Sequence, residues 1–194
     1  MPRIERTSLM TLEQYAKERP KFRAGVLQHK KDRTVHVGNH ITLIFEDELT
    51  IRYQIQEMLR IEKTFEEAGI EGELDAYNPL VPDGGNWKAT MLIEYPDAEM
   101  RKVELAKLRD IEHHVKVVVD GCDPIDGIAD EDMDRSNDEK TSAVHFLRFE
   151  VPRDARDAAR RGAAIDVVVN HPAYAAGTSL TEATRSSLAG DFLG

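Results

Sequence analysis

The order of short β-rich runs and helical segments constrains the fold of this chain more than any other feature. Runs rich in β-branched and aromatic residues alternate with segments whose apolar residues recur at helical spacing. After residue 88 the order is strand, helix, strand, a long insertion, and again strand, helix, strand. That order is typical of a ferredoxin-like α/β sandwich. We therefore predict an α+β fold with an antiparallel or mixed sheet and a ferredoxin-like β-α-β / β-α-β second half.

The first half is expected to supply N-terminal helices and a β-hairpin. A Thr-x-x-Gln capping box at residues 11–14 predicts the start of a helix. Pro20 is expected to end this helix or to open the next one. A Gly-Asn pair at 38–39 separates two β-rich runs and predicts a hairpin. A long helix is expected from about 47 to 68, with Gly69 stopping it.

The length and the single cysteine bound the organisation of the chain. A chain of 194 residues suits one large domain or two small ones. We expect a single domain over 1–194, in which 1–70 form the helices and hairpin and 88–170 form the sandwich portion. One cysteine excludes an internal disulfide and a CxxC motif. The N-terminus has no apolar signal core and no apolar run approaches about 20 residues, so we expect a cytoplasmic protein without membrane association.

The charge of the chain is unevenly distributed. The formal net charge is -10, yet residues 1–33 carry nine Lys or Arg against four Asp or Glu. Residues 120–139 carry nine acidic side chains against one Arg, and we predict that this stretch is a loop. A globally acidic protein repels phosphates and anionic lipids, which argues against nucleic acid and membrane surfaces as main partners. The basic start either forms a solvated helix face or binds an anion.

One carboxylate on the long predicted helix is the first candidate for a functional site. At about 100° per residue, Ile51, Ile55 and Phe65 share one apolar stripe. Glu62 falls in the middle of that stripe, where burial is costly without a cation, a metal or a hydrogen-bond donor. The alternatives are that the stripe ends before Glu62, or that an arginine such as Arg148 pairs with it.

A histidine and a second carboxylate lie on predicted strands. His145 is expected on the apolar face of a central strand, either as a hydrogen-bonded core residue or as a ligand. If the sheet brings these groups together, a carboxylate and imidazole site for a divalent metal becomes possible. The candidate metal ligands are Glu62, Glu94 and His145.

Other polar groups are candidates for binding a ligand. The opposite side of the long helix carries a polar cluster, in which Glu57 and Arg60 stand at the spacing of an i,i+3 ion pair. A solvated face with a local ion pair is the alternative. A long loop at 75–88 contains apolar residues, and long ordered loops are often functional. The candidates are Tyr53, Glu57, Arg60, Asn78, Asn86, Trp87 and Arg148.

Three long runs carry a resemblance to a known family. They are YQIQEMLRIE at 53–62, DAYNPLVPDGGNWKATMLIEYPD at 75–97, and IADEDMDR with KTSAVHFLRFE between 128 and 150. These runs resemble a bacterial family of unknown function, domain of unknown function 3501, and the resemblance spans nearly the whole chain. It implies no activity. It implies a place beside rubrerythrin-type and iron-sulfur oxidoreductase proteins, in electron transfer or peroxide defence.

Two hypotheses of different class follow. In the first, the chain is an accessory or interaction protein of such a redox system, and the acidic loop and the loop around Trp87 are docking surfaces. A single cysteine cannot hold a conventional iron-sulfur cluster, so the chain itself is not expected to carry one. In the second, it is a metal- or small-molecule-binding enzyme or sensor. A purely structural subunit is a third possibility, and the sequence leaves enzymatic activity, metal identity and oligomeric state open.

Overall fold

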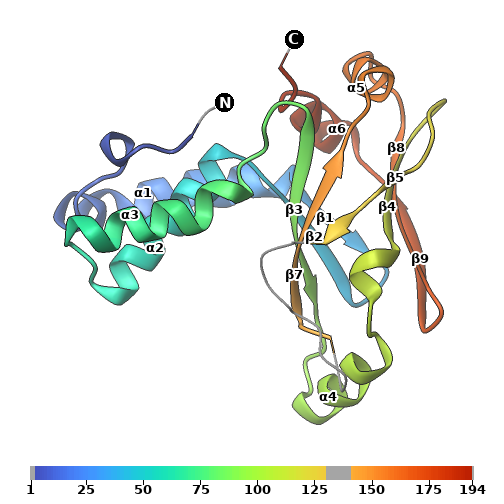
Figure 1. The fold of residues 1–194 in the computed structure, drawn as a ribbon, viewed down its shortest axis with the longest axis horizontal. Helices are drawn as coiled ribbons and strands as arrows, with labels where there is room; N and C mark the ends of the chain where they lie inside the picture. Colours follow the sequence, from blue (N-terminus) through green and yellow to red (C-terminus); the bar gives the residue numbers. More distant parts are fainter. Residues whose placement is uncertain (1–2, 130–140, 194) are drawn as a thin grey trace.

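The computed structural model describes residues 3–129 and 141–193, and it has two parts (Figure 1). A β-body is built from two sheets, and a helical arm projects from one side of it. The helical arm consists of α1 (Leu12–Lys31), α2 (Glu48–Glu62) and α3 (Glu67–Tyr77), with the short turns η1 (Arg6–Ser8) and η2 (Asn78–Leu80) beside it.

The β-body contains a five-stranded and a four-stranded sheet, and every strand pair is antiparallel. The first sheet has the order β1 (Thr34–Val37), β2 (Ile41–Glu46), β3 (Asn86–Ile93), β7 (Val144–Glu150), β6 (Ile128–Ala129). The second has the order β5 (Ile125–Asp126), β4 (Val115–Val119), β8 (Ile165–His171), β9 (Tyr174–Ser179). The remaining elements are α4 (Ala98–Lys107), η3 (Ile111–His114), α5 (Arg153–Arg160) and α6 (Glu182–Ala189).

The α+β class and the antiparallel pairing are confirmed. A ferredoxin-like arrangement would place the four strands of the second half in one sheet, whereas the structure puts β3 and β7 in one sheet and β4 and β8 in the other. The reason is that both sheets have an apolar inner face, and α4 buries only Leu105. Because so short and polar a helix cannot cover a sheet, the two apolar faces pack on each other to form the main core.

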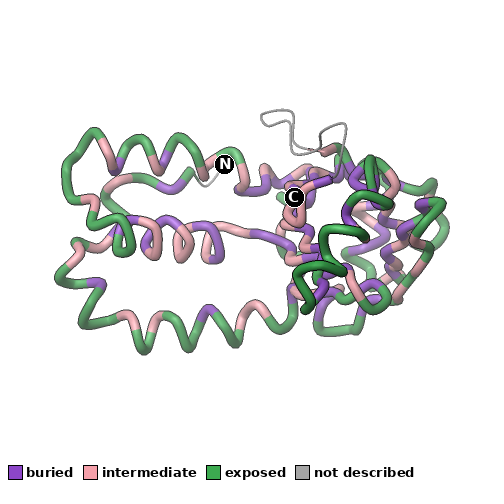
Figure 2. The backbone as a smooth tube through the Cα atoms, turned by 90° about the horizontal axis from the view of Figure 1, so that it is seen from below, coloured by how far each residue is buried: buried purple, intermediate pink, exposed green. Residues whose placement is uncertain are grey.

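The helical arm has a smaller apolar core of its own. Ile51, Ile55 and Leu59 on α2 are buried together with Ile70 and Leu74 of α3. The three helices form a single layer in which α2 lies between α1 and α3, and α1 is exposed over most of its length (Figure 2). In the described part of the chain, most buried apolar side chains belong to one of two clusters. That it is a single domain stays a prediction.

Local sequence signals mark most of the element boundaries. The capping box at 11–14 is formed, as is the hairpin turn at Gly38. Two expectations are wrong. Pro20 does not end its helix: α1 runs through it, with the buried side chains of Tyr15 before it and Val26 after it. The helix expected over 47–68 breaks at Lys63, whose backbone is left-handed, so that two helices form instead of one.

The described residues cover only part of the acidic stretch. Of the loop expected over 120–139, residues 130–139 lie outside the described residues. In residues 3–129 and 141–193, no helix combines the length and the apolar character needed to span a membrane.

One tyrosine joins an edge of each sheet. The hydroxyl of Tyr174 in β9 donates to the Val37 carbonyl at 2.6 Å and accepts from the His40 amide at 3.1 Å. Gly38 makes this approach possible: its φ is +68°, and a Cβ built there would lie 2.5 Å from the Tyr174 hydroxyl oxygen. The hairpin turn therefore requires glycine for two reasons, its backbone conformation and the close tyrosine.

We predict that Gly38→Ala lowers the free energy of unfolding by about 1–3 kcal/mol, because alanine disfavours positive φ and its methyl group would overlap Tyr174. Gly72→Ala in α3 is the matched control, since nothing lies within 4 Å of its Cβ position. The control is expected to be neutral or more stable by up to about 1 kcal/mol. Urea unfolding measures both, and equal stabilities for the two variants would contradict the assignment.

Candidate functional site

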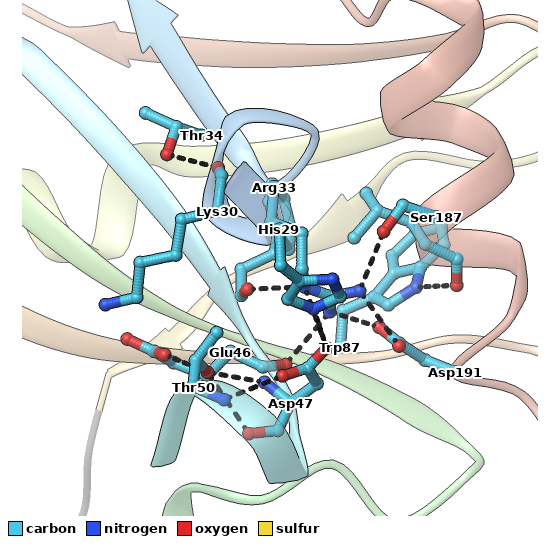
Figure 3. Close-up of polar contacts among 12 residues, drawn as sticks. His29, Lys30, Arg33, Thr34, Glu46, Asp47, Thr50, Trp87, Ser187 and Asp191 are labelled. Carbon is cyan, nitrogen blue, oxygen red and sulfur yellow. Dashed lines mark hydrogen bonds and ion pairs between the residues drawn. The ribbon is translucent and has the colours of Figure 1, made fainter. Parts of the chain in front are cut away.

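A buried arginine lies where the helical arm joins the β-body (Figure 3). Only 1% of the Arg33 side chain is exposed. Its Nε donates to the Phe45 carbonyl at 2.8 Å, and Nη2 donates to the Glu46 carbonyl at 3.0 Å. Nη1 and Nη2 also donate to the two carboxylate oxygens of Asp191, at 3.1 and 2.7 Å, and Nη1 donates to the Ser187 hydroxyl at 3.1 Å. All five N–H groups of the guanidinium therefore have acceptors.

These contacts connect three separate parts of the chain. Arg33 follows α1, its carbonyl acceptors lie at the end of β2, and Asp191 follows α6. Because every donor is used within the protein, this guanidinium is a structural clamp and offers no N–H group to a ligand. The junction accordingly holds the arm on the body.

Two carboxylates share the charge of Arg33. Asp47 caps α2 by accepting from the Thr50 amide at 2.9 Å, and its Oδ2 lies 2.5 Å from His29 Nε2 and 3.5 Å from Arg33 Nε. Burial alone would raise the pKa of Asp47, but the charge of Arg33, the Thr50 amide and His29 outweigh it and lower that pKa. Burial raises the pKa of Asp191 in spite of its two bonds to Arg33, because Asp191 is the more deeply buried of the two. Asp47 thus stays charged to lower pH.

Glu46, a third carboxylate at the junction, is held by two hydroxyl groups. Glu46 is 3% exposed, and its two oxygens accept hydrogen bonds from the Thr50 hydroxyl at 2.5 Å and the Thr90 hydroxyl at 2.6 Å. The two threonines come from α2 and β3, so this carboxylate fastens the first turn of α2 to the sheet.

A second polar cluster lies inside the helical arm, between α1 and α2. Glu57 accepts from Nε and Nη2 of Arg19 at 2.7 and 2.8 Å and from the Tyr15 hydroxyl at 2.7 Å. Arg60 Nη2 lies 3.3 Å from Glu57, so the ion pair expected from the i,i+3 spacing is confirmed. The hydrogen bonds from Arg19 lower the pKa of Glu57 to about 2 against the opposing effect of burial, with further help from Tyr15 and Arg60. Burial, and then the bond to Glu57, raises the pKa of Tyr15.

Tyr53, the remaining candidate on this helix, contacts an aromatic ring and an ammonium group of α1. The Tyr53 ring packs on Phe22 with ring centroids 6.1 Å apart, and the Lys30 ammonium lies 6.0 Å from its centroid. The tyrosine therefore helps to pack α1 against α2.

The three proposed metal ligands do not come together. Glu62 is exposed, which makes the expectation of burial wrong: it is the last residue of α2, and the buried stripe ends at Leu59. Glu94 is also exposed and accepts from the Thr42 hydroxyl at 2.5 Å. His145 is 2% exposed and faces the core, whereas Glu94 has the opposite parity on the paired strand and lies on the other face. Within 3–129 and 141–193, no group of three or more His, Cys, Asp or Glu could hold a metal ion.

His145 has the position of a hydrogen-bonded core histidine. Its Nε2 lies 2.8 Å from the Thr141 hydroxyl and 3.7 Å from Glu112 Oε2. Glu112 is only 5% exposed, and sequence reasoning missed it because a single acidic residue beside two histidines carries no periodic signal.

The proposed ligand-binding residues of the long loop hold the structure together. Asn78 clasps the N-terminal segment, accepting from the Ile4 amide at 2.8 Å and donating to the Ile4 carbonyl at 3.1 Å. Asn86 is buried and accepts from the Asp83 amide at 3.0 Å. Trp87 is fully buried and donates to the Leu188 carbonyl at 3.0 Å, so it cannot form a docking surface.

Arg148, the last of these candidates, pairs with Glu150 on its own strand. The ligand-binding candidates therefore occupy three separate places: the arm, the loop and the first sheet.

The family model described as a protein of unknown function (DUF3501) matches residues 3–192. The chain belongs to the DUF3501 family. A crystal structure of a novel protein of unknown function from Burkholderia pseudomallei K96243 superposes with a TM-score of 0.93 and 51% sequence identity, covering 98% of this chain and 99% of that one. No curated protein matched.

Sequence reasoning missed the clamp of this DUF3501 protein. Arg33 was counted only as part of a basic N-terminal segment, and Asp191 carried no signal. Asp47, with Thr50 three residues later, does have the spacing of an N-cap, and that pattern marks one end of the junction.

We predict that Arg33→Met lowers the free energy of unfolding by about 3 kcal/mol or more, because it leaves two carbonyls and the carboxylates around it without their donor. Arg33→Lys keeps the charge, but an ammonium group cannot replace the five N–H donors of the guanidinium. Most of the loss in the free energy of unfolding should therefore remain. Arg3→Met, at an exposed ion pair with Asp75, is the control and should change stability by less than about 1 kcal/mol. A loss of under 1 kcal/mol in both Arg33 variants, measured by urea unfolding, would show that the clamp is dispensable.

The lowered pKa of Glu57 predicts a pH-dependent contribution to stability. Since the folded-state pKa of about 2 lies below the ordinary value of 4.5, the contribution is complete above about pH 4.5 and is lost as the pH falls towards 2. Glu57→Gln should therefore be less stable than the native protein at pH 7, by about 1–2 kcal/mol, and the gap should narrow below pH 4. Urea unfolding between pH 7 and pH 3 measures the gap, and Glu67→Gln at an exposed pair with Arg6 is the control. A gap that stays constant to pH 3 contradicts this prediction.

Proposed function

We propose that this DUF3501 protein is an accessory protein that binds a partner protein through the tip of its helical arm. The tip comprises residues 61–66, between the end of α2 and the start of α3. It lies at the end of the arm farthest from the β-body (Figure 1). The observation that carries the proposal is the exposure of two large apolar side chains at this tip: Ile61 is 61% exposed and Phe65 is 74% exposed.

The tip has a defined shape. Lys63 adopts a left-handed backbone with φ of 55°, which turns the chain sharply after α2. Thr64 then packs so closely on α3 that a Cβ at Gly69 would lie 2.5 Å from its Cγ2. Apolar groups that are presented on a shaped, projecting turn are typical of a protein-protein contact, because their burial by a partner removes apolar surface from water.

The class of partner rests on the family resemblance and not on the geometry. The resemblance implies an iron-sulfur oxidoreductase or a rubrerythrin-type protein of a redox or peroxide-defence system. Nearly all of the polar side chains that the sequence suggested as binding residues form contacts with other residues of this chain. The exposed tip of the arm is therefore the feature best suited to binding a partner. A redox accessory role is the function that combines these two lines of support.

The proposal predicts that the tagged native protein captures an iron-sulfur or rubrerythrin-type protein from a lysate of the source cells, identified by mass spectrometry. The double variant Ile61→Asp with Phe65→Asp should lose this capture, because it replaces apolar contacts with charges. The matched control is Met100→Asp with Val103→Asp on α4, where the side chains are 53% and 54% exposed.

The control should capture the partner as the native protein does. Capture that never includes either protein class would count against the redox role. Capture that survives the tip substitutions would count against the tip as the docking surface.

A further inference from the structure

A groove runs between α1 and α2 on the helical arm, apart from the tip. Its volume is about 370 Å³, within the usual range of binding pockets. Val26 on its floor is buried, while the neighbouring Phe22 and Leu49 are only partly covered by the protein itself. The residues that line it are Met10, Glu18, Lys21, Phe22, Gly25, Val26 and Leu49.

The groove contains a glycine that lies within helix α1. Gly25 lies inside the 20-residue helix α1, where alanine would be more favourable by about 1 kcal/mol. Its φ is not positive, and a Cβ built on it would meet nothing within 4 Å. Neither the backbone conformation nor packing within this chain therefore requires glycine here. What the glycine does provide is open space along the groove for the close approach of another molecule.

The charge of α1 is opposite to that of the protein. Between Leu12 and Lys31 there are six Lys or Arg and two Glu, in a chain whose net charge is -10. Lys17 and Arg19 pair with Glu13 and Glu57. Further basic residues lie on exposed or partly exposed positions of the same helix: Lys21, Arg23, Lys30 and Lys31. An apolar groove beside a basic helix complements a ligand that is apolar on one side and acidic on the other.

We infer that the groove binds an acidic amphipathic helical segment of a partner protein. The apolar side of that segment would lie on Phe22, Val26 and Leu49, and its backbone would approach Gly25. Its acidic side chains would face Lys21, which lines the groove together with Glu18, and Arg23, an exposed residue of α1 outside that lining. This is the helix-in-groove mode of recognition, in which the positions i, i+3, i+4 and i+7 of the bound helix are the anchors. The inference deepens the proposed function, since it names a second contact of the arm and the chemistry of the partner there.

The test uses two labelled synthetic peptides of about 18 residues, a length at which a helix can form. Both carry leucine at helical spacing, and the remaining positions are mostly Glu in one and mostly Lys in the other. Fluorescence anisotropy with the full chain is expected to show binding of the acidic peptide at least about tenfold tighter than binding of the basic one. Added salt should weaken the acidic peptide's binding.

Gly25→Leu fills the groove and should weaken binding of the acidic peptide about tenfold or more. Gly72→Leu is the matched control: it is also an exposed helical glycine with open space at its Cβ position, and it should leave binding unchanged. Both substitutions favour the helix, so urea unfolding should find neither variant less stable. Reversing the charge at Lys21 and Arg23 to Glu gives a second test, with Lys102→Glu on α4 as its control.

Several results would overturn the inference: no binding of either peptide, equal binding of both, or binding unaffected by Gly25→Leu. A dimer of this chain that Gly25→Leu dissociates, or a random-sequence oligonucleotide that binds more tightly than the acidic peptide, would assign the groove to another occupant and also overturn it. The double variant Ile61→Asp with Phe65→Asp should still bind the peptide. If the native protein captures neither class of redox protein but binds the acidic peptide selectively, the proposed function fails and this inference stands. If the native protein captures such a partner but does not prefer the acidic peptide, this inference alone fails.

Discussion

The arrangement of this protein depends on the buried guanidinium of Arg33. Placing a charged group at 1% exposure is favourable only if its donors are satisfied, and here all five N–H groups have acceptors from β2, α6 and the C-terminal segment. The Arg33 carbonyl in turn accepts from the Phe45 amide at 2.9 Å, which continues the pairing of β1 and β2 up to the arm. The arm therefore extends from a hairpin whose ends are held by hydrogen bonds, and its position follows from that clamp.

The polar groups inside the molecule are used mainly for its own stability. Glu46 is held by two threonine hydroxyls, and Glu57 is held by two arginines and a tyrosine. Asp47 is held by Arg33 and His29. Each group satisfies partners that would otherwise be buried at a cost. Functional chemistry is consequently better sought on the surface of the arm. A tip with exposed Ile61 and Phe65, and a groove with open space at Gly25, both lie there.

Much of the local structure could be predicted from the sequence. The capping box at 11–14, the turn at Gly38 and the pair of Glu57 with Arg60 each depend on residues within four positions of each other. The expectation for Glu62 was wrong because helical periodicity does not show where a helix ends. Helix α2 ends at Glu62 because the backbone of Lys63 is left-handed, and the Glu62 side chain is exposed to solvent. The prediction that Trp87 belongs to a docking surface was also wrong. A loop pattern in the sequence does not reveal that the indole is buried and bonds to α6.

The sequence by itself determined the α+β class, the positions of most strands and helices, and the membership of the DUF3501 family. These follow from periodicity, caps and turns, which are properties of neighbouring residues. Only the tertiary structure decided that the strands divide into two sheets, that Arg33 meets Asp191, and that Tyr174 reaches Gly38. The last two contacts join residues more than 130 positions apart. All of these arrangements form because apolar faces must be buried together and buried charges must find partners, wherever in the chain those partners are.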